Sequence, residues 1–400
     1  MSHVLTLNAG SSSLKFALYA LAGAEPEMLS TGQVERIGDD ARLEAKGGHA
    51  RIERALQGTE GADHAGACTA ILALIAEHYP QAQVAAVGHR VVHGGARFEA
   101  PTAIDDTVLA EIERLAPFAP LHQPHNLEGI RAAQTAFPGT LQVACFDTAF
   151  HRSQPWQADV FALPRAYYDR GVRRYGFHGL SYDYVAGALA EAMPELAAGR
   201  VIVAHLGNGA SMCALKGGVA QGSTMGFSAL DGLMMGTRTG QIDPGVLLYL
   251  IEHEGLDAKA LSDLLYRRSG LLGLSGISND MRALEASEAP EAEQAIGHFI
   301  YRIRRELGAL AGVLGGLDAL VFTAGIGENS AMVRARVCAD QAWLGLILDE
   351  EANAKRLPGV RTISTPESRV RVLVVPTDEE RVIARAAAGL LGADSSETPP

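Results

Sequence analysis

The sequence predicts an α/β protein that is built from two duplicated halves. Apolar, strand-like segments alternate with helical segments along the chain, which is typical of this fold class. A strand–turn–strand unit of one design occurs twice, at residues 4–19 and 200–215. The chain has 400 residues, more than one core usually serves, so we expect two to three structural units.

The expected elements follow this plan in order. The expected strands are residues 4–7, 14–19, 84–89, 141–146, 200–206, 212–215, 319–324 and 371–375. The expected helices are residues 69–76, residues 298–314 ended by Gly315-Gly316, a helix that Ser330 caps, and residues 379–391. Residues 8–13, 207–211 and 325–329 are expected turns or loops that follow strands.

Composition and charge exclude several classes of protein. The 34 basic and 46 acidic residues leave a net charge of −12, which argues against nucleic acid as a partner. Apolar residues make up 48% of the chain, too many for a disordered protein. No uncharged apolar run reaches the roughly 18 residues of a membrane span. A secretory signal begins with a positively charged region, whereas no Arg or Lys precedes Lys15 here. The four cysteines are scattered without a Cys-x-x-Cys pair, so we expect reduced thiols in a cytoplasmic protein.

Three turns are candidates for binding phosphate. The turn 8–13 (NAGSSS), with Lys15 close behind, offers backbone N–H groups and the hydroxyls of Ser11 and Ser13. It lacks the ending of a Walker P-loop, and an exposed hairpin is the alternative reading. The segments 205–209 (HLGNG) and 325–329 (GIGEN) bring glycines next to strand ends, where a nucleotide can approach the main chain. Either alone is more simply a tight turn, but together with the hairpin they favour nucleotide binding.

Two arginines and one aspartate are placed for chemistry on anions. Arg238, in MMGTRTG, could reach a transferring phosphoryl group or could pair with a carboxylate such as Asp243. Arg90 ends a strand before a glycine pair, where a fixed guanidinium suits a carboxylate or phosphate. Asp147 ends another strand, which is where α/β folds place working residues.

Other candidates have strong structural alternatives. His122 and His178 lie among apolar, glycine and proline neighbours, as many structural histidines do. Glu379 begins the last helix, where Thr377 with Glu380 fits a capping box and acids favour the first turn in any case.

Eight segments, in order along nearly the whole chain, resemble the acetate kinases. They are LNAGSSSLKF, GHRVVHGG, FDTAFH, YGFHGLSY, HLGNGAS, DGLMMGTRTG, FTAGIGEN and PTDEE. The resemblance implies two duplicated ribonuclease-H-like domains, each a mixed sheet with flanking helices, around a nucleotide cleft. It implies an enzyme that reversibly transfers phosphate from ATP to acetate, giving acetyl phosphate and ADP by direct in-line displacement. Mg²⁺ is the implied metal, with Mn²⁺ as a substitute, and the enzyme is expected to be a homodimer.

The resemblance also implies domain limits and residue roles. The first domain is expected over 1–150 with a returning helix at about 380–393, the second over 151–379 with most nucleotide contacts, and a flexible tail over 394–400. By the resemblance, the metal ligands are Asn8 and Glu379, Lys15 contacts ATP, and Arg90 takes the substrate carboxylate. His178 and Arg238 stabilise the transition state, with His122 near the phosphoryl path and Asp147 in the active site. The nucleotide contacts are His205, Leu206, Gly207, Asn208, Gly209, Asp280, Met281, Arg282, Gly325, Ile326, Gly327, Glu328 and Asn329.

The acyl pocket is expected, by resemblance, to be lined by Val92, Leu121 and Phe177. Its usual proline is Ala229 here, which opens room for one more methylene, worth about 1 kcal/mol of discrimination. We therefore expect appreciable use of propionate and poor use of butyrate.

Three further positions depart from the family pattern. Gln241 replaces the usual Asp after the TR motif, Gln123 replaces Asn in the PLHNP motif, and Asp378 replaces an Asn before the final acidic pair. None of them removes a named catalytic group.

Alternatives remain open at this stage. A propionate or butyrate kinase would use the same scaffold. An actin-like or Hsp70-like assembly or chaperone module would share the phosphate hairpins but would have little use for Arg90, His122 and His178. An inactive regulatory relative is disfavoured because five candidate residues are intact, namely Asn8, Arg90, Asp147, Arg238 and Glu379.

Overall fold

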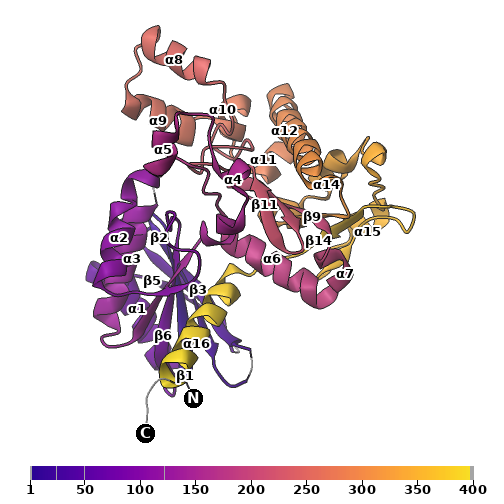
Figure 1. The fold of residues 1–400 in the computed structure, drawn as a ribbon. Helices are drawn as coiled ribbons and strands as arrows, with labels where there is room; N and C mark the ends of the chain where they lie inside the picture. The colour runs from indigo at the N-terminus through magenta and orange to yellow at the C-terminus, as the bar shows by residue number, and fades with distance from the viewer. Residues whose placement is uncertain (1, 24, 49, 121, 397–400) are drawn as a thin grey trace. The chain divides into compact units, whose positions relative to one another are not determined.

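The structure, a computed structural model, describes residues 2–23, 25–48, 50–120 and 122–396 and divides into two compact units. Unit 1 comprises Met1–Phe150 and Asp378–Pro400, and unit 2 comprises His151–Thr377 (Figure 1). The sequence-based limits put Glu379 at the end of the second domain, whereas it falls in unit 1. No helix in the described ranges has the length and apolar character that crossing a membrane requires.

Unit 1 contains an eight-stranded mixed sheet in the order β5-β4-β3-β2-β1-β6-β8-β7. Its strands are β1 (Ser2–Ala9), β2 (Ser13–Ala20), β3 (Glu27–Glu35), β4 (Arg42–Gly47), β5 (Ala50–Ala55), β6 (Gln83–Val91), β7 (Thr102–Ala103) and β8 (Leu141–Phe146). The β1–β6 and β6–β8 pairs are parallel and the others antiparallel. Its helices are η1 (Gly58–Gly61), α1 (His64–His78), α2 (Asp106–Arg114), η2 (Ala116–Phe118), α3 (Gln123–Ala136) and α16 (Glu379–Ser396), and η3 (Ala149–Ser153) spans the boundary with unit 2.

Helices cover both faces of the central strands of this sheet. On one face, Leu5, Phe16 and Val87 pack in a single apolar core with side chains of α1 and α3. Because neighbouring residues of a strand face opposite sides, Gly88 faces the other side. There α16 lies so close that a Cβ on Gly88 would meet the side chain of Ile383. The last helix of the chain therefore completes the first unit (Figure 1).

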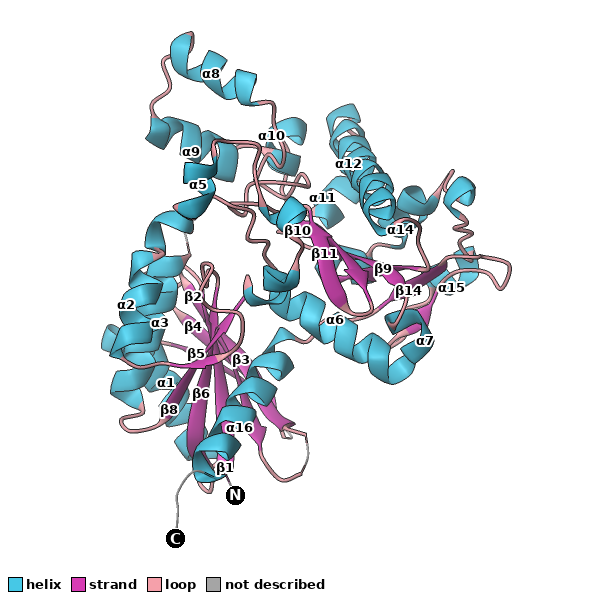
Figure 2. Cartoon of the chain, viewed as in Figure 1, coloured by secondary structure: helices cyan, strands magenta, loops and turns pink. Residues whose placement is uncertain are grey.

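Unit 2 contains a six-stranded mixed sheet in the order β11-β10-β9-β12-β14-β13. Figure 2 draws its strands in magenta. Its strands are β9 (Arg200–Leu206), β10 (Ala210–Lys216), β11 (Val219–Ser223), β12 (Ala319–Thr323), β13 (Arg361–Thr362) and β14 (Arg371–Val374). Its helices are α4 (Trp156–Asp159), α5 (Arg165–Asp169), α6 (Gly179–Ala192), α7 (Pro194–Ala197), α8 (Pro244–Glu252), α9 (Ala258–Arg267), α10 (Gly270–Ser275), α11 (Met281–Glu285), α12 (Pro290–Leu314), α13 (Ala324–Asn329), α14 (Ala331–Cys338), η4 (Ala342–Leu344) and α15 (Glu350–Ala354).

The same strand order recurs in both units. In unit 1, the run β3-β2-β1-β6-β8 is an antiparallel meander followed by two parallel strands. In unit 2, the run β11-β10-β9-β12-β14 repeats that arrangement strand for strand. This repetition confirms the predicted fold class, a duplicated mixed α/β architecture in which each copy opens with a hairpin.

The main differences from the expected elements lie at segment ends. The expected loop 325–329 is the short helix α13, because the carboxylate of Glu328 accepts the N–H of Ala324 at 2.9 Å and so satisfies a donor at the start of the turn. Helix α12 begins at Pro290 rather than at residue 298, and Gly315 ends it with φ 68° as expected. Helix α16 runs to Ser396, so residues 394–396 of the expected tail are helical, and 397–400 lie outside the described residues.

Candidate active site

The hairpin of β1 and β2 presents the predicted phosphate-binding turn. Asn8 pairs with Lys15 across the two strands, and the N–H of Gly10 donates to the carbonyl of Ser13 at 2.8 Å. Lys15 and Ser11 are exposed, and Ser13 is half-buried. The tip therefore offers hydroxyls and one ammonium group to solvent within unit 1.

Arg90 and Asp147 lie together at the ends of two neighbouring parallel strands. Arg90 Nε lies 3.0 Å from Asp147 Oδ1, and Arg90 Nη2 lies 2.7 Å from Oδ2, so the pair is bidentate. The side chain of Asp147 is 2% exposed and that of Arg90 is 22% exposed. Among the described residues, the partners of Arg90 contact its Nε and Nη2 atoms, which leaves Nη1 for an incoming anion. Sequence alone proposed both residues but did not establish that they form this pair.

Glu379 adds a second carboxylate near the same guanidinium, with Oε2 at 3.9 Å from Arg90 Nε. Burial by itself would lower the pKa of Arg90, but the carboxylates of Asp147 and Glu379 outweigh it and raise that pKa. Arg90 therefore stays a cation.

The start of α16 differs from the predicted capping box. The carboxylate of Asp378, not the hydroxyl of Thr377, caps the helix by accepting the N–H of Arg381 at 3.0 Å. Burial raises the pKa of Glu380, with further increments from Glu379 and Asp378. Glu379 therefore does not cap the helix, and its side chain is 17% exposed.

The described residues expected to contact the acyl group belong to different units. Val92 is buried in unit 1 just beyond Arg90, and Phe177 is buried in unit 2. Leu121 lies outside the described residues. His122 is half-buried at the start of α3 in unit 1.

In unit 2, His178 is fixed at the start of α6 in a left-handed conformation, with φ 58°. Its Nδ1 lies 2.8 Å from the hydroxyl of Ser211, and its ring stacks on that of His205 at 4.1 Å between centroids. A non-glycine residue with positive φ is uncommon and marks strain of the kind that functional sites hold.

Arg238 converges with His178 on the second hairpin. A Cβ on Gly209 would lie 3.1 Å from His178 Nε2 and 3.9 Å from Arg238 Nη1, so the glycine sits between the two side chains. Arg238 Nη1 donates to the carbonyl of Ala229 at 3.1 Å. Arg238 does not pair with Asp243, the carboxylate considered above. Asp243 instead caps α8 by accepting the N–H of Gly245 at 2.8 Å.

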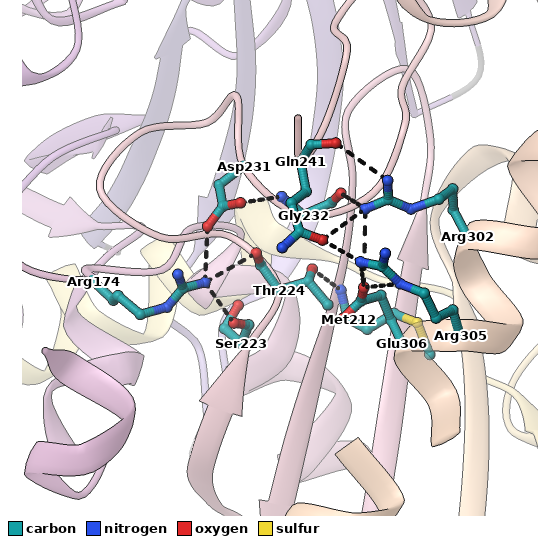
Figure 3. Close-up of polar contacts among 10 residues, drawn as sticks. All are labelled: Arg174, Met212, Ser223, Thr224, Asp231, Gly232, Gln241, Arg302, Arg305 and Glu306. Atoms are coloured by element: carbon teal, nitrogen blue, oxygen red, sulfur yellow. Dashed lines mark hydrogen bonds and ion pairs between the residues drawn. The ribbon is translucent and has the colours of Figure 1, made fainter. Parts of the chain in front are cut away.

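Hydrogen bonds between its two ends hold the loop that carries Arg238. The N–H of Gln241 donates to the carbonyl of Gly232 at 3.0 Å and closes the segment 232–241. The buried guanidinium of Arg302, from α12, donates to that same carbonyl at 3.1 Å and to the side-chain oxygen of Gln241 at 3.2 Å (Figure 3). Arg305 also donates to this oxygen. Gln241, where the resemblance leads us to expect Asp, therefore accepts hydrogen bonds from two arginines.

Three predicted nucleotide segments line one cavity of about 590 Å³ in unit 2. Gly207 and Asn208 follow β9, Asp280 to Arg282 begin α11, and Gly325, Ile326 and Asn329 come from α13. This volume lies within the range of small-molecule sites. The structure adds Asn279 and Arg356, of which Asn279 could have been found as the neighbour of Asp280, while nothing in the sequence around Arg356 singles it out.

The other predicted nucleotide residues support this cavity without lining it. His205 and Leu206 are buried at the end of β9, and Gly327 is buried in α13. Glu328 accepts the N–H groups of Ala324 and, at 3.1 Å, of Thr377, while burial raises the pKa of its carboxyl. The structure thus brings the three predicted segments together, but the sequence could not separate residues that line the cavity from residues that lie behind it.

The described residues contain no group of three or more His, Cys, Asp or Glu side chains arranged to hold a metal ion. Asn8 and Glu379 supply two oxygen-bearing side chains in unit 1, at the end of β1 and the start of α16. The strand β1 and the helix α16 pack against each other. Mg²⁺ in phosphoryl-transfer sites is held by few protein oxygens together with substrate phosphates, and this donor set suits it.

Comparison with known proteins gives consistent matches. The chain matches the model of the acetokinase family over residues 3–385. An acetate kinase of Methylocella silvestris is 53% identical over 397 residues, which covers 97% of this chain and 98% of the relative. An acetate kinase of Rhodopseudomonas palustris is 51% identical over 388 residues, which covers 96% of each.

Solved structures are similar over nearly the whole chain as well. The acetate kinase of Porphyromonas gingivalis has a TM-score of 0.87 at 40% identity, covering 98% of this chain and 100% of that one. A propionate kinase from Francisella tularensis has a TM-score of 0.90 at 36% identity, covering 97% and 100%.

Proposed function

Because this chain belongs to the acetokinase family, we propose that it transfers the γ-phosphoryl group of ATP to acetate, reversibly, giving acetyl phosphate and ADP. The observation that carries the proposal is the bidentate Arg90–Asp147 pair, which holds a permanent cation with Nη1 left for a carboxylate. The cavity of about 590 Å³ in unit 2 supports ATP and ADP as the second pair of substrates.

The acceptor needs no general base. Acetate is ionised at neutral pH, so its oxygen attacks without losing a proton. Asp147 therefore acts as a positioning residue: both of its oxygens contact Arg90, and the guanidinium it fixes holds acetate for in-line attack on the terminal phosphorus. His122 adds a polar group at the start of α3 in the same unit.

Side chains of unit 2 and of the unit 1 hairpin stabilise the negative charge of the phosphates and of the transferring phosphoryl group. Arg238 and His178 take the charge that develops on the equatorial oxygens of a metaphosphate-like group. Lys15 and the hydroxyls of Ser11 and Ser13 hold the phosphates. We assign Asn8 and Glu379 to a divalent cation, Mg²⁺ or in its place Mn²⁺. These two side chains would hold the ion, which would supply positive charge against the phosphates.

Propionate is a second acceptor on this proposal. Ala229 is smaller than the family's usual proline, and a propionate kinase is among the similar structures. One added methylene, worth about 1 kcal/mol here, changes discrimination by about fivefold, whereas two exceed the space gained. We expect appreciable activity with propionate and poor activity with butyrate. Equal kcat/KM for acetate and butyrate would contradict this assignment.

We also propose that the enzyme is a cytoplasmic homodimer. Its four cysteines are free thiols, as in reducing compartments. The apolar helix α8 has no buried residue, and Leu248 and Tyr249 are 58% and 53% exposed. An exposed apolar face of this kind suits a second copy of the chain. Light scattering after gel filtration should give twice the mass of 42.2 kDa, and Leu248→Glu should shift it toward the monomer.

The decisive assay is hydroxylamine trapping of acetyl phosphate formed from ATP, acetate and Mg²⁺. Wild-type protein should form the trapped hydroxamate, and Arg238→Ala should reduce its rate by at least about 100-fold, because it removes a charge that acts in the transition state. ATP hydrolysis with no acetate stimulation would favour an actin-like or Hsp70-like module instead.

A further inference from the structure

Two groups assigned above to different substrates lie on separate segments of unit 1. The hairpin carries Lys15, assigned to the phosphates, and Asn8, assigned to their metal ion, while the end of β6 carries Arg90, assigned to the carboxylate. In a direct displacement the reacting atoms must be held at contact distance, and an error of about 1 Å can cost about 100-fold in rate. The two segments therefore need a rigid connection.

The side chain of Asn126 makes that connection. It projects from α3, is 2% exposed, and bonds to both segments at once. Its Oδ1 accepts the N–H of Val92 at 3.0 Å, two residues after Arg90. Its Nδ2 donates to the carbonyl of Ala9 at 3.1 Å, next to Asn8. Because Val92 can only donate and Ala9 can only accept at these atoms, the amide has one orientation.

The rest of α3 is shaped around this bridge. One turn after Asn126, Gly129 brings the helix so near the hairpin that a Cβ there would lie 2.8 Å from the Cβ of Ala9. One turn before it, Gln123 is fully buried, accepts the N–H of His93 at 3.2 Å and donates to the carbonyl of His93 at 2.9 Å. One face of α3 thus holds both the hairpin and the segment that follows Arg90.

We infer that Asn126 is a positioning residue that fixes the spacing between the phosphate-binding hairpin and the carboxylate-binding Arg90. The inference rests on the proposed function. Gln123 bonds to the segment after Arg90 and to the carbonyl of Ile112 at 3.3 Å, but not to the hairpin, so of these two amides Asn126 is the one that joins the two segments.

Three variants test this role. Asn126→Leu keeps a similar shape and removes both bonds, and we expect kcat to fall by about 10- to 100-fold at every pH. Asn126→Asp keeps the acceptor for Val92, but its ionised carboxylate cannot donate to Ala9. When protonated it can donate, and burial raises the pKa of an introduced carboxyl, so its kcat relative to wild type should recover as the pH falls from about 8 to about 5.

Gln123→Glu is the matched control, since it places a carboxyl in the same helix at similar burial without touching the hairpin. Thermal unfolding of each protein at each pH confines the comparison to folded enzyme. Wild-type kinetics in Asn126→Leu would overturn the inference. So would an Asn126→Asp profile parallel to wild type, or an equal pH-dependent loss of kcat in Gln123→Glu. If wild-type protein forms no acetyl phosphate, the proposed function fails instead, and the two failures are distinct.

Discussion

Replacing Asp147 with Asn separates a positioning role from a role in proton transfer. The carboxylate receives Arg90 Nε at 3.0 Å and Nη2 at 2.7 Å. An amide can still accept at one atom, but its NH₂ group then faces a donor of Arg90, so one charge-assisted bond is lost. Such a bond is worth about 1.5–3 kcal/mol, and a factor of ten corresponds to about 1.4 kcal/mol. We therefore expect kcat/KM for acetate to fall by about 10- to 100-fold.

The assay is the initial rate of acetyl phosphate formation from about pH 5 to about pH 9, with acetate varied at saturating ATP. The variant should lose rate at every pH while keeping the shape of the wild-type profile, because no essential ionisation belongs to Asp147. An ionisation in the wild-type profile that disappears in Asp147→Asn would refute the positioning role and make Asp147 a proton acceptor.

Asp318→Asn is the matched control. Asp318 forms the same bidentate pair with Arg200, at 3.0 and 2.7 Å, but its side chain is 35% exposed in unit 2 and belongs to no proposed site. This variant should leave kcat/KM within about twofold of wild type, because exposed ion pairs contribute little. A comparable loss in both variants would mean that the effect of Asp147→Asn is one of general stability.

Three further outcomes follow from buried groups. Burial lowers the pKa of His89 from 6.5 to about 4, so its neutral form stabilises the fold above about pH 6.5 and that stability is lost as the pH falls toward 4. Urea unfolding should show this slope, and His89→Gln should flatten it; an unchanged slope would contradict the assignment. Burial raises the pKa of Cys68 and Cys338 to about 12, so iodoacetamide at pH 8 should modify them, by mass spectrometry, only after denaturation. Modification of the folded protein would argue against their burial. Gly236 donates its N–H to the carbonyl of Asn208 at 3.1 Å, and a Cβ there would collide with the Asn208 side chain, so Gly236→Ala should weaken ADP binding by about tenfold in calorimetry. Gly308→Ala, where a Cβ meets open space, should leave ADP binding unchanged. Equal ADP affinity in the two variants would contradict this prediction.

Sequence predicted the fold class because hydrophobic periodicity and turn residues are local signals. Strand 141–146 and the end of α12 at Gly315 were predicted at the observed residues. The helix α13 was not, because its glycines favour a loop and only the carboxylate of Glu328, four residues on, satisfies its first N–H.

The site was predictable where residue type alone limits the chemistry, and not where spatial neighbours decide it. Arg90 and Asp147 stood out as charges at strand ends, but their bidentate pairing depends on the parallel register of β6 and β8. Asn126 has ordinary helical neighbours in the sequence, and only the close approach of α3 to the hairpin shows its two bonds. Arg356 lines the cavity of unit 2 from a stretch of sequence with no motif.

The return of α16 to the first sheet determines the order in which the polypeptide can mature on the ribosome. Until residues 379–396 have emerged, the strand face around Gly88 lacks the helix that covers it, so the unit that begins the chain is the last to be finished. Unit 2, whose residues are contiguous, can complete its own core first. Chains released from the ribosome before α16 is made should therefore have a folded unit 2 and a unit 1 sheet with one face uncovered. Such chains should be prone to aggregation.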